Sequence, residues 1–260
     1  MYSILEKAII STDANEKEKL IKEINVNPES KEKPKFFEKP SYATLCKIVP
    51  PANVPRRRGF ETDEKKAVLL HALIHIEYSA IDLALDACYR FRNLPVEFYK
   101  DWLEVAADEI RHFRLINNLL EKTGHKYGDF PVHNSLFEAA QKTQDLISRM
   151  AVIPRWYEAN GLDANEKIIR RVQKYNDPFA QEVIAVLKII LKEEIPHVKK
   201  GDKWFKFSCE KENLKPVQTY FQIVDNFFKD WKKKDLNVAA RLKAGFSCDE
   251  LNILSGEKVC

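Results

Sequence analysis

The chain has 260 residues, of which 45% are hydrophobic and only 7 are glycine, a composition that suits a helical globular protein. Its 43 basic residues nearly balance 39 acidic ones, so the net charge of +4 neither requires nor excludes a nucleic-acid partner. The first residues lack the apolar core of a signal peptide, and we expect no apolar run of membrane-spanning length. These features predict a cytoplasmic protein without a membrane partner.

The five cysteines are odd in number and scattered, with no C-x-x-C pair among them: Cys46, Cys88, Cys209, Cys248 and Cys260. Such usage is typical of reduced thiols in the cytosol. We therefore expect neither a disulfide framework nor a zinc knuckle.

The N-terminal 60 residues are predicted to form an appendage. Residues 1–25 read as one or two short helices, and residues 26–60 as a proline-rich extended arm that packs along the rest of the protein. The arm closes at Arg56-Arg57-Arg58, which we interpret as a solvated basic turn, with a clamp for phosphate or another anion as the alternative.

Four long helices are expected to form an all-α core over residues 61–212. The first begins after the N-cap Thr62 and runs to Phe91, and the second begins after Pro95 and ends at Gly124. The third covers 134–160 and stops at Gly161, and the fourth covers 178–212. A shorter helix, capped by Asp163, fills 164–175.

Residues 213–260 are predicted to form a peripheral C-terminal region. A helix over 216–233 carries an aromatic face that we expect to pack on the core, with a dimer or substrate surface as the alternative. The basic run Lys232-Lys233-Lys234 and a mixed tail follow it.

Two long helices carry the same short motif, Glu-x-x-His. Glu109 precedes His112, and Glu194 precedes His197, at the spacing that places both side chains on one helical face. Each motif follows a lone glutamate one helix earlier, Glu77 or Glu158. A single Glu-x-x-His is a weak signal, whereas two copies with matching partner glutamates are specific. On four bundled helices this pattern holds two iron or manganese ions.

The glutamates lie in the middle of apolar stripes. Residues that share a helical face with Glu77 are Leu70, Leu73, Ile74, Ala80, Ile81, Ala84 and Cys88. Four buried carboxylates would each cost several kcal/mol unless they are protonated, paired or bound to metal. No lysine or arginine occupies the centres of these stripes, so the pattern favours metal over buried Glu–His pairs without it.

Two features weaken the pattern. Pro196 lies between Glu194 and His197, where a kink or bulge could rotate His197 off its face. The expected helix end at Gly161 comes three residues after Glu158, which places Glu158 in the last turn of its helix.

Other polar residues are assigned lesser roles. We interpret His71 and His75 as hydrogen-bonded or surface groups, with a His-x-x-x-His metal pair as the alternative. Surface charges are expected at Asp82, Asp86 and Asp108, although each could orient a ligand imidazole. Radical chemistry is not assigned to the aromatic neighbours of the ligands, Tyr78, Trp156 and Tyr157.

Three segments resemble the ferritin-like superfamily, and more narrowly a bacterial family of uncharacterised ferritin-like proteins: H-A-L-I-H-I-E ending at Glu77, D-E-I-R-H-F around Glu109, and E-E-I-P-H-V around Glu194, with Trp204-Phe205 beyond. The likeness covers most of residues 30–245. It implies a four-helix bundle with a dinuclear carboxylate centre held by Glu77, Glu109, His112, Glu158, Glu194 and His197. The narrower family brings no established reaction.

The function expected from these features is that of a di-iron oxidoreductase that uses dioxygen to hydroxylate or oxidise an unidentified substrate. Manganese could replace iron, the electron donor is unknown, and a modified tRNA base or a small molecule is a possible substrate. A small homo-oligomer is also possible. The alternatives are a ferroxidase or iron-handling protein, which the long termini disfavour, and a metal-free helical scaffold, which leaves the stripe-centred glutamates unexplained.

Overall fold

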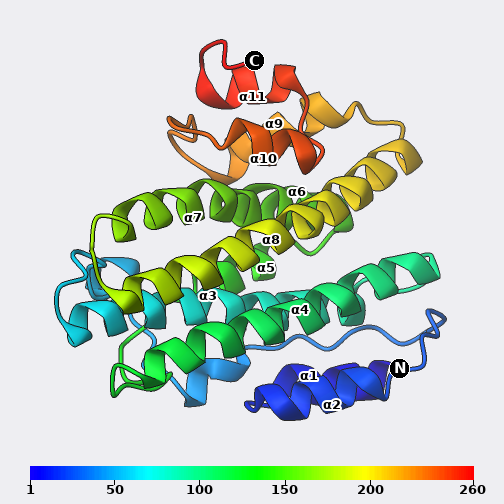
Figure 1. Cartoon of the computed structure of the whole chain (residues 1–260). Coiled ribbons are helices and arrows are strands. Elements are labelled where there is room, and N and C mark those ends of the chain that lie inside the picture. Colours follow the sequence, from blue (N-terminus) through cyan, green and yellow to red (C-terminus); the bar gives the residue numbers. More distant parts are fainter. The chain divides into compact units, whose positions relative to one another are not determined.

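Every regular element of the protein is a helix (Figure 1). The computed structural model describes residues 1–260, and its one β contact is an isolated bridge between Ile48 and Val132. The all-α class is therefore confirmed. The chain divides into two compact units, Met1–Phe137 and Glu138–Cys260. The four-helix bundle and the three-part division at residues 60 and 212 stay predictions.

The first unit is built on two long helices, α3 (Asp63–Arg90) and α4 (Val96–Glu121), which pack against each other. Both begin where the sequence predicted. The Thr62 hydroxyl accepts a hydrogen bond from the Lys65 N–H at 3.3 Å, and Pro95 precedes α4. The smaller elements are α1 (Tyr2–Ile10), α2 (Ala14–Lys22), the short 3₁₀ helices η1 (Ser41–Thr44) and η2 (Pro51–Asn53), and α5 (Ser135–Lys142) at the boundary.

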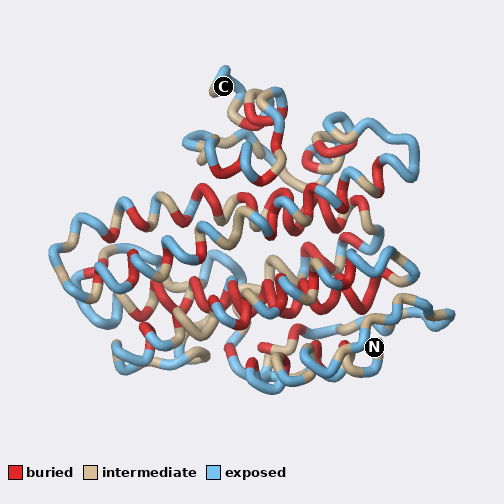
Figure 2. The backbone as a smooth tube through the Cα atoms, turned by 45° about the vertical axis from the view of Figure 1, so that its right-hand side comes forward, coloured by how far each residue is buried: buried red, intermediate tan, exposed pale blue.

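Helix α3 combines length with an apolar composition. By length and composition it could cross a membrane, contrary to our expectation that no run is long enough. However, 83% of its most apolar window is buried inside the protein, as in the core helix of a soluble protein. Figure 2 shows buried residues along the long helices and exposed residues in the connections.

Two aspartates of α3 that we expected on the surface are buried in ion pairs. Asp82 accepts from Lys17 of α2 at 2.7 Å, and Asp86 pairs with Arg90 one turn on at 2.7 Å. The surface interpretation was wrong because the cations that neutralise these carboxylates are themselves buried. Lys17 thereby joins the N-terminal helices to α3.

The second unit begins with a helical segment in three parts: α6 (Leu146–Val152), the π-helix η3 (Ile153–Glu158) and α7 (Ala159–Val172). It packs on α8 (Pro178–Lys211), which the Asp177 side chain caps through the Phe179 N–H at 3.0 Å. The C-terminal elements are α9 (Pro216–Phe227), α10 (Val238–Lys243) and α11 (Cys248–Ser255).

The predicted single helix over 134–160 was wrong in two respects. The chain breaks within it, and the helical segment extends beyond residue 160. The chain breaks at residues 143–145, where the buried Arg149 side chain donates to the carbonyl oxygens of Ala140 at 2.7 Å and Thr143 at 3.2 Å. The helix then continues through Gly161 to Val172, because the cost of one helical glycine is only about 1 kcal/mol.

The predicted cap at Asp163 was also wrong. This residue lies inside α7, and its carboxylate accepts from the buried Arg241 guanidinium at 2.7 Å. Asp145 is the true cap of the segment, since its side chain accepts from the Ser148 N–H at 2.7 Å.

The C-terminal cysteines do not follow the prediction of five reduced thiols. Cys46, Cys88 and Cys209 are buried free thiols, whereas Cys248 and Cys260 form a disulfide. The reason is a chain reversal after α11. Gly256 adopts a left-handed conformation (φ 75°), and the returning tail is fixed where the Val259 N–H donates to the Asn252 side chain at 2.7 Å.

Candidate metal centre

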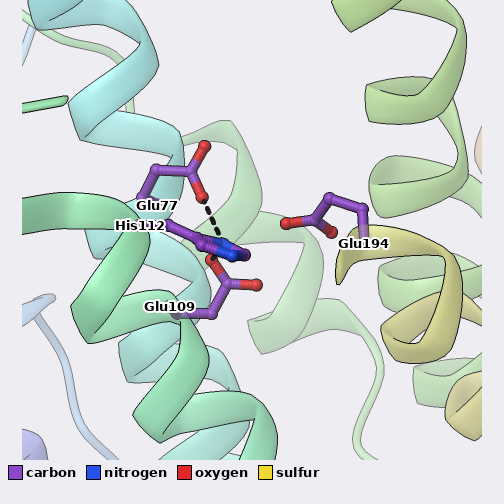
Figure 3. Close-up of side chains that lie close together, drawn as sticks. All are labelled: Glu77, Glu109, His112 and Glu194. Carbon is purple, nitrogen blue, oxygen red and sulfur yellow. Dashed lines mark ion pairs between the residues drawn. The ribbon is translucent and has the colours of Figure 1, made fainter. Parts of the chain in front are cut away.

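The first unit brings three of the predicted ligands together. Glu77 lies on α3, and Glu109 and His112 lie one turn apart on α4. The Nδ1 atom of His112 is 3.5 Å from Glu77 Oε2 and 3.5 Å from Glu109 Oε2. Figure 3 shows the two carboxylates on either side of the imidazole ring; the Glu194 drawn with them belongs to the second unit.

These three side chains are shielded from solvent. The exposed fractions of Glu77, Glu109 and His112 are 7%, 1% and 0%. Each offers one potential ligand atom, and these atoms lie within 4.8 Å of one another. Two carboxylate oxygens and an imidazole nitrogen suit iron, manganese or zinc. This buried cluster of glutamates and histidine can hold a metal ion.

The second unit repeats the pairing of carboxylate and imidazole. In α8, Nδ1 of the fully buried His197 lies 3.6 Å from Glu194 Oε2. The same two atom types face each other in the first unit, where His112 Nδ1 lies near Glu109 Oε2. Pro196 does not disturb this pair, because α8 runs continuously from Pro178 to Lys211 with the proline inside it.

Glu158, the sixth predicted ligand, is half-buried and is the last residue of the π-helix η3. The position of Glu158 along the axis of α8 follows from one close contact. Gly201 lies so close to Pro154 that an added Cβ would overlap the proline ring. Helices α7 and α8 form an antiparallel hairpin (Figure 1), so the residue four places after Pro154 lies level with the residue four places before Gly201. That pair is Glu158 and His197.

His71 and His75 serve the structure of the first unit. His71 Nε2 accepts from the Gly128 N–H at 2.9 Å. His75 Nε2 lies 2.7 Å from the His133 carbonyl oxygen, so it carries the proton, and Nδ1 accepts from the Tyr127 hydroxyl at 3.0 Å. These hydrogen bonds fasten residues 127–133 to α3. The hydrogen-bonded interpretation is confirmed over the metal-pair alternative.

Acidification is expected to weaken the first unit through His71. Burial lowers the pKa of His71 from 6.5 to about 4. In the unfolded chain His71 binds a proton as the pH falls below about 6.5, whereas in the folded protein it stays neutral until about pH 4. The stability that neutral His71 contributes is therefore complete above pH 6.5 and is lost as the pH falls toward 4. Urea titrations of metal-free protein at pH 7.5 and 5.0 should show about 2 kcal/mol of loss from this group.

The matched variant for that measurement is His71→Gln, whose amide oxygen can accept from Gly128 at either pH. It should lose about 2 kcal/mol less than the wild type between pH 7.5 and 5.0. Equal losses in the two proteins would contradict the assignment of this pH dependence to His71.

The remaining polar candidates make contacts of their own or are exposed. Tyr78 stacks on Tyr127 with ring centroids 5.4 Å apart, and Asp108 pairs with Arg111 at 2.9 Å. Arg56, Arg57 and Arg58 are exposed, as predicted for a solvated turn. The run at Lys232–Lys234 is not uniformly exposed, since Lys233 lies 4.2 Å over the Trp156 ring and burial lowers its pKa to about 8.

The sequence prediction missed Arg155, which is fully buried beside the ligand-bearing turn. It pairs with Asp202 of α8 at 3.0 Å and with Glu250 of α11 at 2.7 Å. The one available signal was its position in the apolar run before Glu158, where a charged residue needs buried partners. Those partners lie 47 and 95 residues away, so the sequence does not identify them.

Comparison with known proteins places the chain among proteins without an assigned activity. A family model described as "Protein of unknown function (DUF455)" matches residues 3–252. An uncharacterised protein of Haemophilus influenzae is 40% identical over 213 residues, which cover 79% of this chain and 73% of that protein. No solved structure matches.

Proposed function

The chain belongs to this family of unknown function, and we propose that it is a dinuclear metal carboxylate protein, specifically a di-iron oxidoreductase that uses dioxygen. In this proposal Glu77, Glu109 and His112 provide one half of the centre, and Glu158, Glu194 and His197 provide the other. The observation that carries it is the repeated pairing of histidine Nδ1 with glutamate Oε2, at 3.5 Å in one unit and 3.6 Å in the other.

The donor set fits the proposed metals. It contains four carboxylates and two imidazoles, and the buried thiol of Cys88 instead faces the Tyr99 carbonyl oxygen at 3.7 Å. Oxygen-rich ligation with some imidazole favours iron and manganese, whereas a thiolate-rich set would favour zinc. Glu-x-x-His motifs combined with single glutamates from other helices are the pattern of dinuclear carboxylate proteins.

Each residue is assigned a role within the proposed centre. Glu109 and Glu194 would bridge the two ions, Glu77 and Glu158 would bind one ion each, and each histidine would bind through Nδ1. Bound ferrous ions would supply electrons for the reduction of dioxygen. The burial of Glu109, His112 and His197 would exclude bulk water from that chemistry.

The proposal also covers the substrate and the location of the protein. We propose a small organic molecule or a modified tRNA base as the substrate, with the exposed Arg56, Arg57 and Arg58 as phosphate contacts. We propose a cytoplasmic location, in keeping with the three buried free thiols. A small homo-oligomer and an unidentified electron donor complete the proposal.

Removal of the two bridging carboxylates should abolish metal binding. Wild type and the Glu109→Ala/Glu194→Ala double variant would be reconstituted with anaerobic ferrous iron and desalted, and the metal per chain would be measured. The wild type should retain about two ions per chain and the double variant almost none. Oxygen consumption after exposure to air should follow the iron content.

The control is Glu104→Ala, which removes an exposed glutamate from the same helix as Glu109. It should keep the wild-type metal content. A wild type that holds less than about half an ion per chain would contradict the dinuclear proposal. A metal-free helical interaction scaffold would then be the leading alternative.

A further inference from the structure

The π-helix that ends at Glu158 is an unusual element that requires support. π-helices are rare and occur mostly as single turns within α-helices, often at functional sites. The wider turn accommodates one extra residue, so the residues after η3 are rotated by about 100° relative to an uninterrupted α-helix. If η3 relaxed to α geometry, Glu158 would rotate away from its present direction relative to Pro154. The contacts of η3 therefore determine where this carboxylate points.

One buried side chain in the middle of η3 contacts both α8 and the C-terminal helices. Arg155 is fully buried, its Nε lies 3.0 Å from Asp202 of α8, and its Nη2 donates to Glu250 of α11 at 2.7 Å. The guanidinium carbon also lies 4.3 Å from the ring centroid of Tyr220 and 4.7 Å from that of Phe246. The C-terminal region thus surrounds a cation that belongs to the π turn.

The backbone of the turn is held as well. The Tyr220 hydroxyl on α9 donates to the Arg155 carbonyl oxygen at 3.1 Å, and both groups are buried. A carbonyl in a π turn loses its usual α-helical partner, because its hydrogen bond is displaced by one residue. The Tyr220 hydroxyl therefore gives the Arg155 carbonyl oxygen a hydrogen-bond donor from outside the helix.

Glu250 is fixed in turn by the start of α11. Its Oε1 accepts from Arg155, while its Oε2 accepts from the Ser247 N–H at 2.8 Å in a capping box. Burial alone would raise the pKa of Glu250, but the Arg155 charge and the Ser247 N–H together lower it, so it stays ionised. Burial raises the pKa of Asp202, so Glu250 is the partner of Arg155 that keeps its negative charge more readily.

We propose that Arg155 is a positioning residue, held by Tyr220 and Glu250, that maintains the π turn and thereby directs Glu158 to the level of His197. The C-terminal helices α9 and α11 then act as a clamp on a ligand-bearing turn rather than as a peripheral cap. This inference rests on the proposed metal centre for its functional consequence, whereas the clamp itself concerns the metal-free protein.

The sharpest variant is Tyr220→Phe, which keeps the ring over Arg155 and removes only the hydroxyl. Its matched control is Tyr99→Phe, because Tyr99 is also fully buried and donates to a main-chain carbonyl, that of Phe91, at 2.8 Å. Glu250→Gln serves as a second variant that removes the charge of one of the two anionic partners of Arg155. Far-UV circular dichroism and thermal unfolding would establish that each variant is folded.

Two readouts test the clamp in the full-length protein. Amide hydrogen exchange of the metal-free protein should be at least tenfold faster over residues 153–160 in Tyr220→Phe and Glu250→Gln than in wild type, with Tyr99→Phe unchanged there. Titration with Co²⁺ should show binding of one of two ions weakened by about tenfold or more, with an altered visible spectrum, in the same two variants alone.

The outcomes separate the clamp from the metal centre. Unchanged exchange over 153–160 in both variants would overturn the clamp, and faster exchange with wild-type Co²⁺ affinity and spectrum would overturn the positioning role. A wild type that takes up no Co²⁺ would sink the proposed function and the positioning role together. Faster exchange combined with one weakened Co²⁺ site, absent from Tyr99→Phe, would support the inference.

Discussion

Lys17→Met is expected to destabilise the first unit by about 3–5 kcal/mol, which corresponds to a fall of roughly 10 °C or more in its unfolding midpoint. The Lys17 Nζ is fully buried and donates to Asp82 and to the Ala8 carbonyl, both at 2.7 Å. Methionine fills a similar volume, so the loss comes from the charge. Asp82 would be left in a buried position with only the neutral donors of Ser41, its hydroxyl at 2.6 Å and its main-chain N–H.

The expected size agrees with an independent argument from proton binding. Burial already raises the pKa of Asp82, and the Lys17 charge opposes that rise. Without Lys17, Asp82 of the folded protein would bind a proton. At pH 7, which is about three pH units above the unperturbed aspartate pKa near 3.9, protonation costs about 1.4 kcal/mol for each unit. The deficit of the variant should therefore shrink by roughly 2–3 kcal/mol when unfolding is measured at pH 5.

Lys19→Met is the matched control, because Lys19 lies on the same helix and is exposed. It should change the free energy of unfolding by less than about 0.5 kcal/mol. A Lys17→Met variant as stable as Lys19→Met at pH 7, or a deficit that does not shrink at pH 5, would contradict the account.

The long helices could be predicted because their signals are local. Thr62, Pro95 and Asp177 mark three helix starts that the structure contains, and each acts through groups within one turn. The two Glu-x-x-His pairs could be predicted for the same reason, since residues three apart share a helical face. The pair around Pro196 kept its geometry because α8 continues past the proline.

The failures concern features that long-range contacts decide. Lys17 is the second charge in the run Glu16–Lys19, and nothing in that run indicates that it will be buried against a carboxylate 65 residues later. Arg149 ends α5 by bonding to carbonyls upstream, and Gly161 is retained within α7 because tertiary packing outweighs its weak propensity. The π-helix has no sequence signature of its own. Its position depends on Pro154, Arg155 and their distant partners.

Gly201→Ala is expected to separate the packing of η3 from simple helix propensity. An alanine Cβ at this position would overlap the ring of Pro154, and a proline ring fused to the backbone cannot rotate away. The overlap should cost on the order of 1–3 kcal/mol and push η3 away from α8. Higher helix propensity would offset up to about 1 kcal/mol of that cost, so we expect a net loss of stability.

Gly161→Ala provides the internal reference, because Gly161 also lies inside a helix but has no atom within 4 Å of an added Cβ. Both variants gain the same helix propensity, so the difference between their free energies of unfolding measures the steric cost at Pro154 alone. Gly161→Ala should be stabilised by about 0.5–1 kcal/mol. Two variants of equal stability would show that η3 and α8 can separate at no cost.

The same pair of variants tests the register of Glu158. Pro154 opposite Gly201 sets Glu158 level with His197, so displacement of η3 should weaken the ligand set of the second unit and leave that of the first unit intact. Gly201→Ala reconstituted with ferrous iron should therefore retain about one ion per chain where Gly161→Ala retains about two. Full metal content in Gly201→Ala, together with the expected loss of stability, would mean that Glu158 does not depend on this contact. Pro154 would then stabilise the fold without orienting the ligand.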